Sequence, residues 1–301
     1  MYLSQDKSSK LRLIVSLILI AIAIIAVIFG ILGKQEGTSP TAQTVGDDFI
    51  RVLDVGQGDS ILITSNGKSM LVDTGTSMGA NDLCSKLRGY GIRSLDVLLL
   101  THFHNDHAGG LEEVTSRFTV ENLIYPDAQK SDQVDSTAVN AKKNVLAEEG
   151  DFFVAKQGMS IELGDFEITV IGYYPDLKDE NNRSIVLMVK LNKHKVLLAA
   201  DMEKTAESVL IEDGINLECD VLKVGHHGSS SSSSEEFIKR CNPKATVISC
   251  GIGNQYSHPH EETLKLFEKE KLNLYRTDLN GDITLQILPD NIEIECEKSD
   301  K

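Results

Sequence analysis

The chain has 301 residues and a formal net charge of −15, with 41% hydrophobic and 25% charged residues. This length and apolar content are sufficient for a domain with a substantial core. The acidity argues against a protein that holds nucleic acid through a broad basic surface, although it leaves open an enzyme that meets phosphates mainly through metal ions.

The first predicted element is a membrane-spanning helix. Residues 13–32 carry no charge, and at about 1.5 Å per residue they span roughly the 30 Å hydrocarbon core of a bilayer. Lys7, Lys10 and Arg12 precede this run, so the positive-inside rule places residues 1–12 in the cytoplasm and the rest of the chain outside. A cleaved signal peptide is the alternative, although its apolar region is usually shorter. We therefore expect a single-pass protein of the cell membrane with an extracellular domain.

The composition changes after the apolar run. Residues 33–48 form a polar linker with glycine, serine, proline and threonine, and the predicted domain comprises residues 49–301. Because residues 1–12 carry a net charge of +2, residues 13–301 carry −17. The portion expected outside the cell is therefore strongly acidic.

Short strands and helices alternate through the domain. Strands are predicted at 49–55, 61–64, 70–73, 95–100, 152–155, 160–163, 166–173, 184–191, 195–200, 221–224, 245–249 and 282–288. Helices are predicted at 81–90, 109–117, within 134–149, and at 204–211, 235–241 and 261–270. This alternation indicates an α/β protein with two sheets between two helix layers, an αββα sandwich.

Three local features accompany these elements. Asn66-Gly67 predicts a hairpin turn between two strands. Asn81 is a plausible cap for the first helix of the domain. The run of six serines at Ser229–Ser234 predicts a mobile loop.

The stretch THFHNDHAGG at residues 101–110 predicts a metal site. His102 and His104 point the same way if the chain is extended, so both can bind one metal ion. The chain then turns, and Asp106 and His107 can face a second ion nearby. Imidazole and carboxylate ligands suit zinc, and also manganese or iron. A histidine-rich surface loop is the alternative, but a fully apolar strand precedes the motif and Ala-Gly-Gly follows it, which favours close packing behind a site.

This motif resembles the H-x-H-x-D-H signature of metallo-β-lactamase-fold proteins. The chain is similar in particular to the metal-hydrolase domain of the ComEC family of DNA-uptake competence proteins. The shared stretches, in the same order, are LDVGQGDSILI (53–63), LVDTG (71–75), DVLLLTHFHNDHAGG (96–110), LLAADM (197–202), DVLKVGHHGSS (220–230) and YSHPH (256–260). The several membrane helices of that family are absent from this sequence.

The resemblance implies a site for two divalent metal ions, zinc or manganese. It makes Asp201 the carboxylate that bridges both ions and expects the last ligand from His226 or His227. Related phosphoesterases suggest that His227 binds metal while His226 contacts the phosphate. His258 matches a recurring His-Pro of the family and is expected to contact substrate or serve as an alternative ligand. His260 is expected to start a helix.

One histidine of the wider superfamily is missing here. Most members supply a third histidine to the first metal between the H-x-H-x-D-H motif and the bridging aspartate. The only histidine in that interval is His194, which is expected on the surface of a hairpin far from the site. ComEC-like proteins carry asparagine in that region, matched by Asn181-Asn182. We therefore expect the first metal to be weakly held.

Two further acids are expected to support the ligands. Asp59, in the GQGDS loop at 56–60, and Asp73 can hydrogen-bond ligand side chains from behind. The glycines of that loop fit either an approach of backbone amides to an anion or a simple tight turn.

Metal-activated water is the expected nucleophile, with Asp106 orienting it and His226, His227 or His258 assisting at the phosphate. The resemblance implies hydrolysis of DNA phosphodiesters outside the cell. The alternatives are a phosphodiesterase for cell-wall polymers or small nucleotides, and a non-catalytic module of a DNA-uptake complex. Local basic patches such as Lys239-Arg240 or Arg276 would help DNA binding despite the acidic total.

Overall fold

The computed structural model describes residues 48–298. The predicted cytoplasmic segment and membrane helix, and the predicted linker up to residue 47, lie outside the described residues. Within residues 48–298, every helix is too short or too polar to cross a bilayer.

The first of two sheets has eight strands in the spatial order β15-β14-β1-β2-β3-β4-β5-β6. Neighbouring strands from β15 to β3 pair antiparallel, whereas β3 to β6 run parallel to one another. The strands are β1 (Phe49–Val52), β2 (Ile61–Ser65), β3 (Lys68–Val72), β4 (Ser94–Leu99), β5 (Thr119–Tyr125), β6 (Asp151–Val154), β14 (Ile283–Ile287) and β15 (Ile292–Cys296).

The second sheet has seven strands in the spatial order β13-β12-β11-β10-β9-β8-β7. Strands β10 to β13 are parallel, so the loops that follow β10, β11 and β12 leave the same edge of the sheet. The strands are β7 (Ser160–Leu163), β8 (Phe166–Gly172), β9 (Val186–Leu191), β10 (His194–Leu198), β11 (Val221–Lys223), β12 (Ala245–Ile248) and β13 (Asn273–Arg276).

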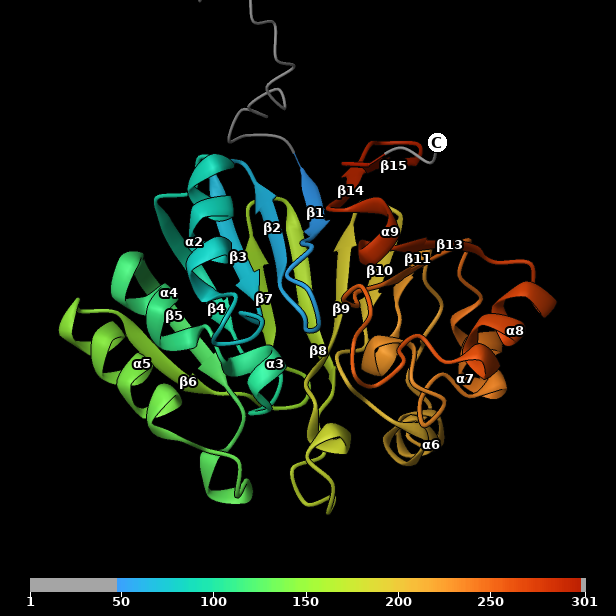
Figure 1. Cartoon of the computed structure of the whole chain (residues 1–301), viewed down its shortest axis with the longest axis horizontal. Helices are drawn as coiled ribbons and strands as arrows, with labels where there is room; N and C mark the ends of the chain where they lie inside the picture. Colours follow the sequence, from blue (N-terminus) through green and yellow to red (C-terminus); the bar gives the residue numbers. More distant parts are fainter. Residues whose placement is uncertain (1–47, 299–301) are drawn as a thin grey trace, which may run out of the picture. The chain divides into compact units, whose positions relative to one another are not determined.

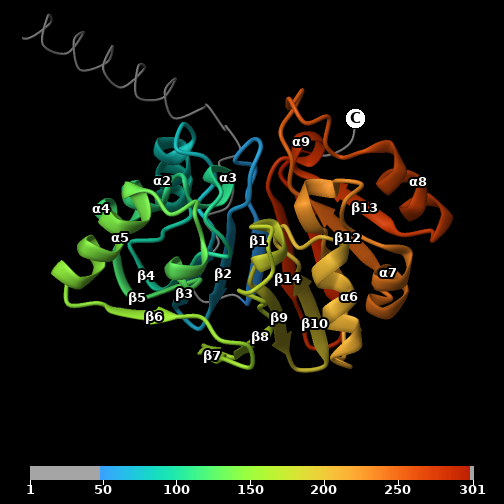
Figure 2. The same ribbon diagram turned by 90° about the horizontal axis from the view of Figure 1, so that it is seen from below.

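Helices cover the outer face of each sheet (Figures 1 and 2). Helices α2, α4 and α5 pack on the first sheet, and α6, α7 and α8 pack on the second. The helices are α2 (Ala80–Gly89), α3 (Asn105–Ala108), α4 (Leu111–Arg117), α5 (Ser136–Ala147), α6 (Lys204–Glu212), α7 (Glu235–Cys241), α8 (Glu261–Lys269) and α9 (Thr277–Asn280), with short 3₁₀ turns η1 (Ala128–Lys130), η2 (Asn181–Arg183) and η3 (Gly225–Gly228).

Three apolar layers follow from the alternation of side chains along each strand. In β2, Ile61 and Ile63 enter the core between the two sheets, whereas Leu62 faces the helices on the outside. In β10, Val196 and Leu198 likewise point inward and Leu197 points toward α6 and α7. Strands buried on both faces are apolar throughout, which explains the continuous runs in the sequence. The predicted α/β sandwich with two sheets is confirmed.

Most predicted elements correspond to observed ones. Three local expectations differ, namely the cap at Asn81, the surface position of His194 and the mobile loop at Ser229–Ser234. Asn66-Gly67 does turn between β2 and β3, and both residues have positive φ. Helix α2 is capped by Gly79, so the cap predicted at Asn81 is wrong. His194 begins β10 with only 6% of its surface exposed and with its Nδ1 3.6 Å from Asp220 Oδ2, so the surface position predicted for it is also wrong.

The six-serine run is not an exposed mobile loop. Ser229, Ser232 and Ser233 are buried. The backbone N–H groups of Ser233 and Ser234 both donate hydrogen bonds to the buried carboxylate of Glu207 on α6. A carboxylate that accepts backbone donors in this way fixes the segment against α6. The composition of the run concealed these contacts because its partner lies 26 residues away in the sequence.

Candidate metal centre

Four segments that follow strands of both sheets form the candidate centre. The loop after β4 carries His102 and His104, and α3 continues it with Asp106 and His107. The other three segments follow neighbouring parallel strands of the second sheet. They carry Asp201 after β10, His226 and His227 in η3 after β11, and His258 after β12.

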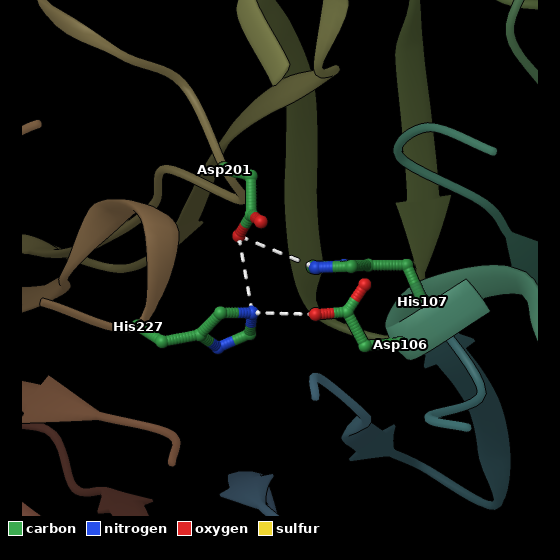
Figure 3. Close-up of side chains that lie close together, drawn as sticks. All are labelled: Asp106, His107, Asp201 and His227. Carbon is green, nitrogen blue, oxygen red and sulfur yellow. Dashed lines mark ion pairs between the residues drawn. The ribbon is translucent and has the colours of Figure 1, made fainter. Parts of the chain in front are cut away.

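Asp106, His107, Asp201 and His227 converge on one point (Figure 3). One ligand atom from each lies within 4.8 Å of all the others. Asp201 Oδ1 is 3.3 Å from His107 Nε2 and 3.5 Å from His227 Nε2, while His227 Nε2 is 3.3 Å from Asp106 Oδ2. These separations are short enough for all four groups to bind a single ion.

The buried atoms at this point lack ordinary partners. His107 Nε2, His227 Nε2 and Asp201 Oδ1 make no hydrogen bond within the described part of the chain. Unsatisfied polar atoms are rare in protein interiors and call for an explanation such as a bound ion. Two imidazole nitrogens and two carboxylates match the ligand preferences of zinc and manganese. The residues present therefore fit a divalent metal ion.

A second group of side chains lies beside the first. His102 Nε2 and His104 Nδ1 are 3.2 Å apart, as expected for two imidazoles that face one ion. Asp201 Oδ2 lies 3.9 Å from His102 Nε2 and 3.8 Å from His226 Nε2. Asp201 thus presents one oxygen to each group, which is the arrangement expected of a bridging carboxylate.

Strong electrostatic coupling accompanies this geometry. Burial lowers the pKa of His227, but the charge of Asp201 and the nearby carboxylates of Asp106 and Asp59 outweigh burial and raise it to about 10. Burial alone would raise the pKa of Asp201, yet His227 and His107 hold it well below its usual range. Burial and the neighbouring His107 lower the pKa of His102 well below its ordinary value, which leaves its ring neutral. Such a concentration of perturbed groups is typical of functional sites.

The ligand side chains are held from behind. His107 Nδ1 is 2.7 Å from Asp73 Oδ2, and Thr101 donates to both oxygens of that carboxylate. His227 Nδ1 is 2.9 Å from the carbonyl of Ser249. These contacts place an N–H on Nδ1 of each ring and direct Nε2, the remaining ligand atom, at the cluster. Asp73 therefore lies where the sequence predicted a supporting carboxylate.

Asp59 also lies behind His227, with its Oδ1 3.5 Å from His227 Nδ1. Its other oxygen accepts a 2.7 Å hydrogen bond from Lys223, and both side chains are almost fully buried. Lys223 was not predicted from the sequence. The signal was a lysine inside an otherwise apolar strand, in the VLKV of residues 221–224.

Glycine is required where the GQGDS loop meets the ligand loop. A Cβ at Gly58 would lie 2.3 Å from the carbonyl oxygen of Asp106, and the next residue, Asp59, donates its N–H to that same oxygen. A side chain there would push the two loops apart. Neither an anion site nor a simple turn is needed to explain this glycine.

An open cavity of about 650 Å³ leads to the centre. His258 lines it, with its ring 6.0 Å from that of His227 and 5.3 Å from that of His226. Burial and these two histidines lower the pKa of His258 to about 4. His260 instead caps α8 and bonds Ser230 and Tyr256, which confirms its predicted place at a helix start. His194 contacts none of the cluster residues in the described part of the chain.

The structure thus brings together every residue predicted for the site. The side chains in or around the cluster are those of His102, His104, Asp106, His107, Asp201, His226, His227 and His258. Of the two adjacent histidines, His227 is the one that closes the four-residue cluster. Their roles as ligands or catalytic groups stay predictions. Glu203, which lies 3.1 Å from His226 Nδ1, was missed, although it follows Asp201 by two residues.

Comparisons with known proteins agree with this arrangement. ComE operon protein 3 of Bacillus subtilis is 33% identical over 255 residues, which cover 78% of this chain and 32% of that protein. Competence protein ComA of Neisseria gonorrhoeae is 31% identical over 244 residues, which cover 80% of this chain and 33% of that protein. The chain thus spans about a third of the length of these relatives. The expected similarity to the hydrolase domain of the competence proteins is confirmed.

Solved structures support the fold alone. CmlA, a diiron β-hydroxylase from Streptomyces venezuelae, matches with a TM-score of 0.56 at 16% identity, over 81% of this chain and 55% of that chain.

The family model described as the metallo-beta-lactamase superfamily matches residues 53–252, which include the H-x-H-x-D-H motif, Asp201 and His227. The chain therefore belongs to the metallo-β-lactamase superfamily.

Proposed function

We propose that this protein is a metal-dependent phosphodiesterase that hydrolyses DNA outside the cell. The observation that carries this proposal is the convergence of Asp106, His107, Asp201 and His227 at the base of an open cavity. Members of the superfamily hold divalent metal ions, typically two. In this chain His102, His104 and Asp201 would hold the first ion, and Asp106, His107, Asp201 and His227 the second.

When bound, such ions activate water and neutralise charge on a phosphoryl oxygen. The protein's own groups orient the reactants around this chemistry. Asp106 keeps 24% of its side chain exposed at the cavity, so one of its oxygens can accept a hydrogen bond from the attacking water. His258 lines the same cavity and can donate a hydrogen bond to the phosphate or to the leaving oxygen.

Zinc or manganese is proposed as the metal. Both accept mixed nitrogen and oxygen ligands, and the cluster offers two imidazoles and two carboxylates. The named competence relatives support DNA as the substrate. The lining of the cavity supports it less strongly, because among the described residues that line it there is no lysine or arginine. The expected basic patches are neutralised as well, since Lys239, Arg240 and Arg276 all pair with acids.

We also propose that residues 13–32 anchor the chain in the cell membrane, with the domain outside. Support comes from the uncharged run and the preceding positive charges. Extraction of membranes at alkaline pH would leave an anchored protein in the pellet. Protease added to intact cells would then digest the domain if it lies outside, and would spare it if it lies in the cytoplasm.

The test of the activity uses the full chain in detergent, stripped of metal and reloaded separately with zinc, manganese or magnesium. Single-stranded DNA, double-stranded DNA and a small chromogenic phosphodiester would be assayed side by side, with Asp201→Ala as the control. Metal-dependent cutting of DNA that is lost in Asp201→Ala is the expected result. Turnover of the small ester alone would indicate cell-wall or nucleotide phosphodiesters instead. No turnover with metal demonstrably bound would contradict phosphodiesterase activity and favour a non-catalytic role in DNA uptake.

A further inference from the structure

We infer that His226 is the third nitrogen ligand of the first metal position, beside His102 and His104. This inference rests on the two-metal centre proposed above. It replaces the phosphate contact that the sequence suggested for His226, and it accounts for the histidine that this chain lacks before Asp201.

The two oxygens of Asp201 face different histidines. Oδ1 faces His107 and His227, at 3.3 and 3.5 Å from their Nε2 atoms. Oδ2 faces His102 and His226, at 3.9 and 3.8 Å from their Nε2 atoms. The four imidazoles therefore form two pairs, one beside each oxygen of Asp201. His226 is paired with His102, which is expected at the first metal position.

Glu203 fixes the orientation of the His226 ring. Its Nδ1 lies 3.1 Å from Glu203 Oε1, so the N–H is on Nδ1 and the lone pair is on Nε2. His107 is held in the same way by Asp73, and His227 by the carbonyl of Ser249. A carboxylate or carbonyl behind the ring is the usual companion of a metal-binding histidine.

Glu203 is itself fixed, as such a supporting group needs to be. Ser231 Oγ donates to its Oε1 at 2.7 Å, and Asn182 Nδ2 donates to its Oε2 at 3.2 Å. His226 nevertheless keeps 21% of its side chain exposed at the cavity, so its ring is positioned by these contacts and not by dense packing.

Asn181 lies beside the His226 ring. This residue stands in the region where most superfamily members have the third histidine. Its Nδ2 lies 3.4 Å from His226 Nε2, a position from which the amide N–H can donate to that nitrogen in the absence of a metal ion. The His226 ring therefore extends to the side chain that occupies the region of the missing histidine.

The backbone of η3 explains how two adjacent residues can serve one bridging carboxylate. His226 and His227 both adopt left-handed conformations, with φ of 46° and 52°. In a strand, neighbouring side chains point to opposite faces, whereas this turn directs both rings to Asp201. Two consecutive non-glycine residues in the left-handed region of φ carry backbone strain. Such strain is typical of functional sites.

The test measures metal binding and needs no substrate. The full chain in detergent, stripped and then equilibrated with manganese or zinc, would be analysed for bound metal after gel filtration and titrated by calorimetry. We expect two ions per wild-type chain. In His226→Ala we expect one ion bound as in the wild type and a second bound at least tenfold more weakly. Glu203→Gln, which leaves the histidine in place, should weaken only the same ion.

His260→Ala is the matched control, because His260 is a nearby part-buried histidine whose two nitrogens are already bonded by Ser230 and Tyr256. It should bind both ions as the wild type does. Two ions at wild-type affinity in both His226→Ala and Glu203→Gln would overturn the inference. Fewer than two ions in the wild type would instead contradict the two-metal centre itself. Circular dichroism of each metal-free variant checks folding; if His226→Ala does not fold, Glu203→Gln alone decides.

Discussion

Asp73 is the residue whose loss should most directly disturb the four-residue cluster, because it holds His107. Its carboxylate holds His107 Nδ1 at 2.7 Å and is itself held by Thr101. Asp73→Asn removes the charge that orients the ring, so we expect metal affinity to fall by about 10- to 100-fold. Competition with a chelating indicator would measure it. Asp96→Asn, a carboxylate on β4 that bonds Lys68 and Ser69, is the control, and equal affinities in the two variants would contradict the prediction.

Lys223 and Asp59 form a buried ion pair behind His227. Lys223→Met leaves a buried carboxylate uncompensated, and we expect the free energy of unfolding to fall by about 3–5 kcal/mol. Urea unfolding of the metal-free chain would measure the change. The double variant Lys223→Met with Asp59→Leu removes both charges and should regain most of the lost stability. A double variant as unstable as the single one would refute this electrostatic explanation.

Among the contacts between structural elements, Glu207 on helix α6 accepts hydrogen bonds from the backbone of the serine run. Burial raises the pKa of Glu207, although bonds from Ser234 and Ser233 oppose the rise. In the window between the unfolded value near 4.5 and the raised folded value, the folded state binds more protons than the unfolded state. Stability due to this group is therefore complete below the window and decreases as pH rises through it.

We accordingly expect the free energy of unfolding of the wild type to fall, relative to Glu207→Gln, as pH increases above about 4.5. Denaturant titrations of both proteins across that range would measure the difference. Glu212→Gln, an exposed glutamate at the end of the same helix, should show no such divergence from the wild type. A constant difference between wild type and Glu207→Gln at all pH values would count against the assigned titration.

Elements buried on both faces were the easiest to predict. The apolar run of β4 and the alternating pattern of β8 determine their strands locally, because most of the apolar side chains of these strands enter one of the three apolar layers. Three strands were missed. β13 and β15 are sheet edges with partly exposed side chains, and the exposed Glu121 interrupts β5. A strand that buries little has a weak hydrophobic signal, and its pairing depends on distant partners.

The candidate site shows the same division between local and distant information. His102, His104, Asp106 and His107 lie within one motif, so their types and spacing indicated a metal site without a structure. The partners behind the ligands were harder to find. Glu203 lies 23 residues from His226 in the sequence, and Lys223 lies 164 residues from Asp59. The pairing of β10 with β11 brings Glu203 to His226, and the packing of the two sheets brings Lys223 to Asp59.

The loop after β12 places an aromatic ring at the mouth of the cavity. Tyr256 is 52% exposed, lines the cavity, and stacks at 5.7 Å against His258. If the substrate is DNA, a base can stack on this ring, which is worth about 1–3 kcal/mol. We therefore expect Tyr256→Ala to raise KM for single-stranded DNA by about 5- to 150-fold.

The same variant should leave KM for a small phosphodiester without a base nearly unchanged, because that substrate has nothing to stack. Ile252→Ala is the matched control, since Ile252 is 80% exposed on the same loop but does not line the cavity. Steady-state kinetics on both substrates would distinguish the effects. An equal rise of KM for both would indicate general disruption of the loop.

At the scale of the whole molecule, the acidic charge limits how the proposed DNA substrate could be held. Residues 13–301 carry a net charge of −17, and no lysine or arginine lies among the described residues that line the cavity. Proteins that neutralise many phosphates with basic side chains release counterions, so their affinity falls steeply with salt. Here the metal centre and ring stacking would provide most of the binding.

We therefore expect the KM for single-stranded DNA to depend weakly on salt. A logarithmic plot of affinity against salt concentration should have a slope no steeper than about −1.4, the value for two phosphates on single-stranded DNA. Steady-state kinetics between about 50 and 200 mM salt would measure it, since a protein with many phosphate contacts loses affinity steeply over that range. The small phosphodiester, which offers one phosphate, serves as the reference. A slope that corresponds to six or more phosphates would show that a basic surface outside the cavity guides the DNA, contrary to the charge distribution of this chain.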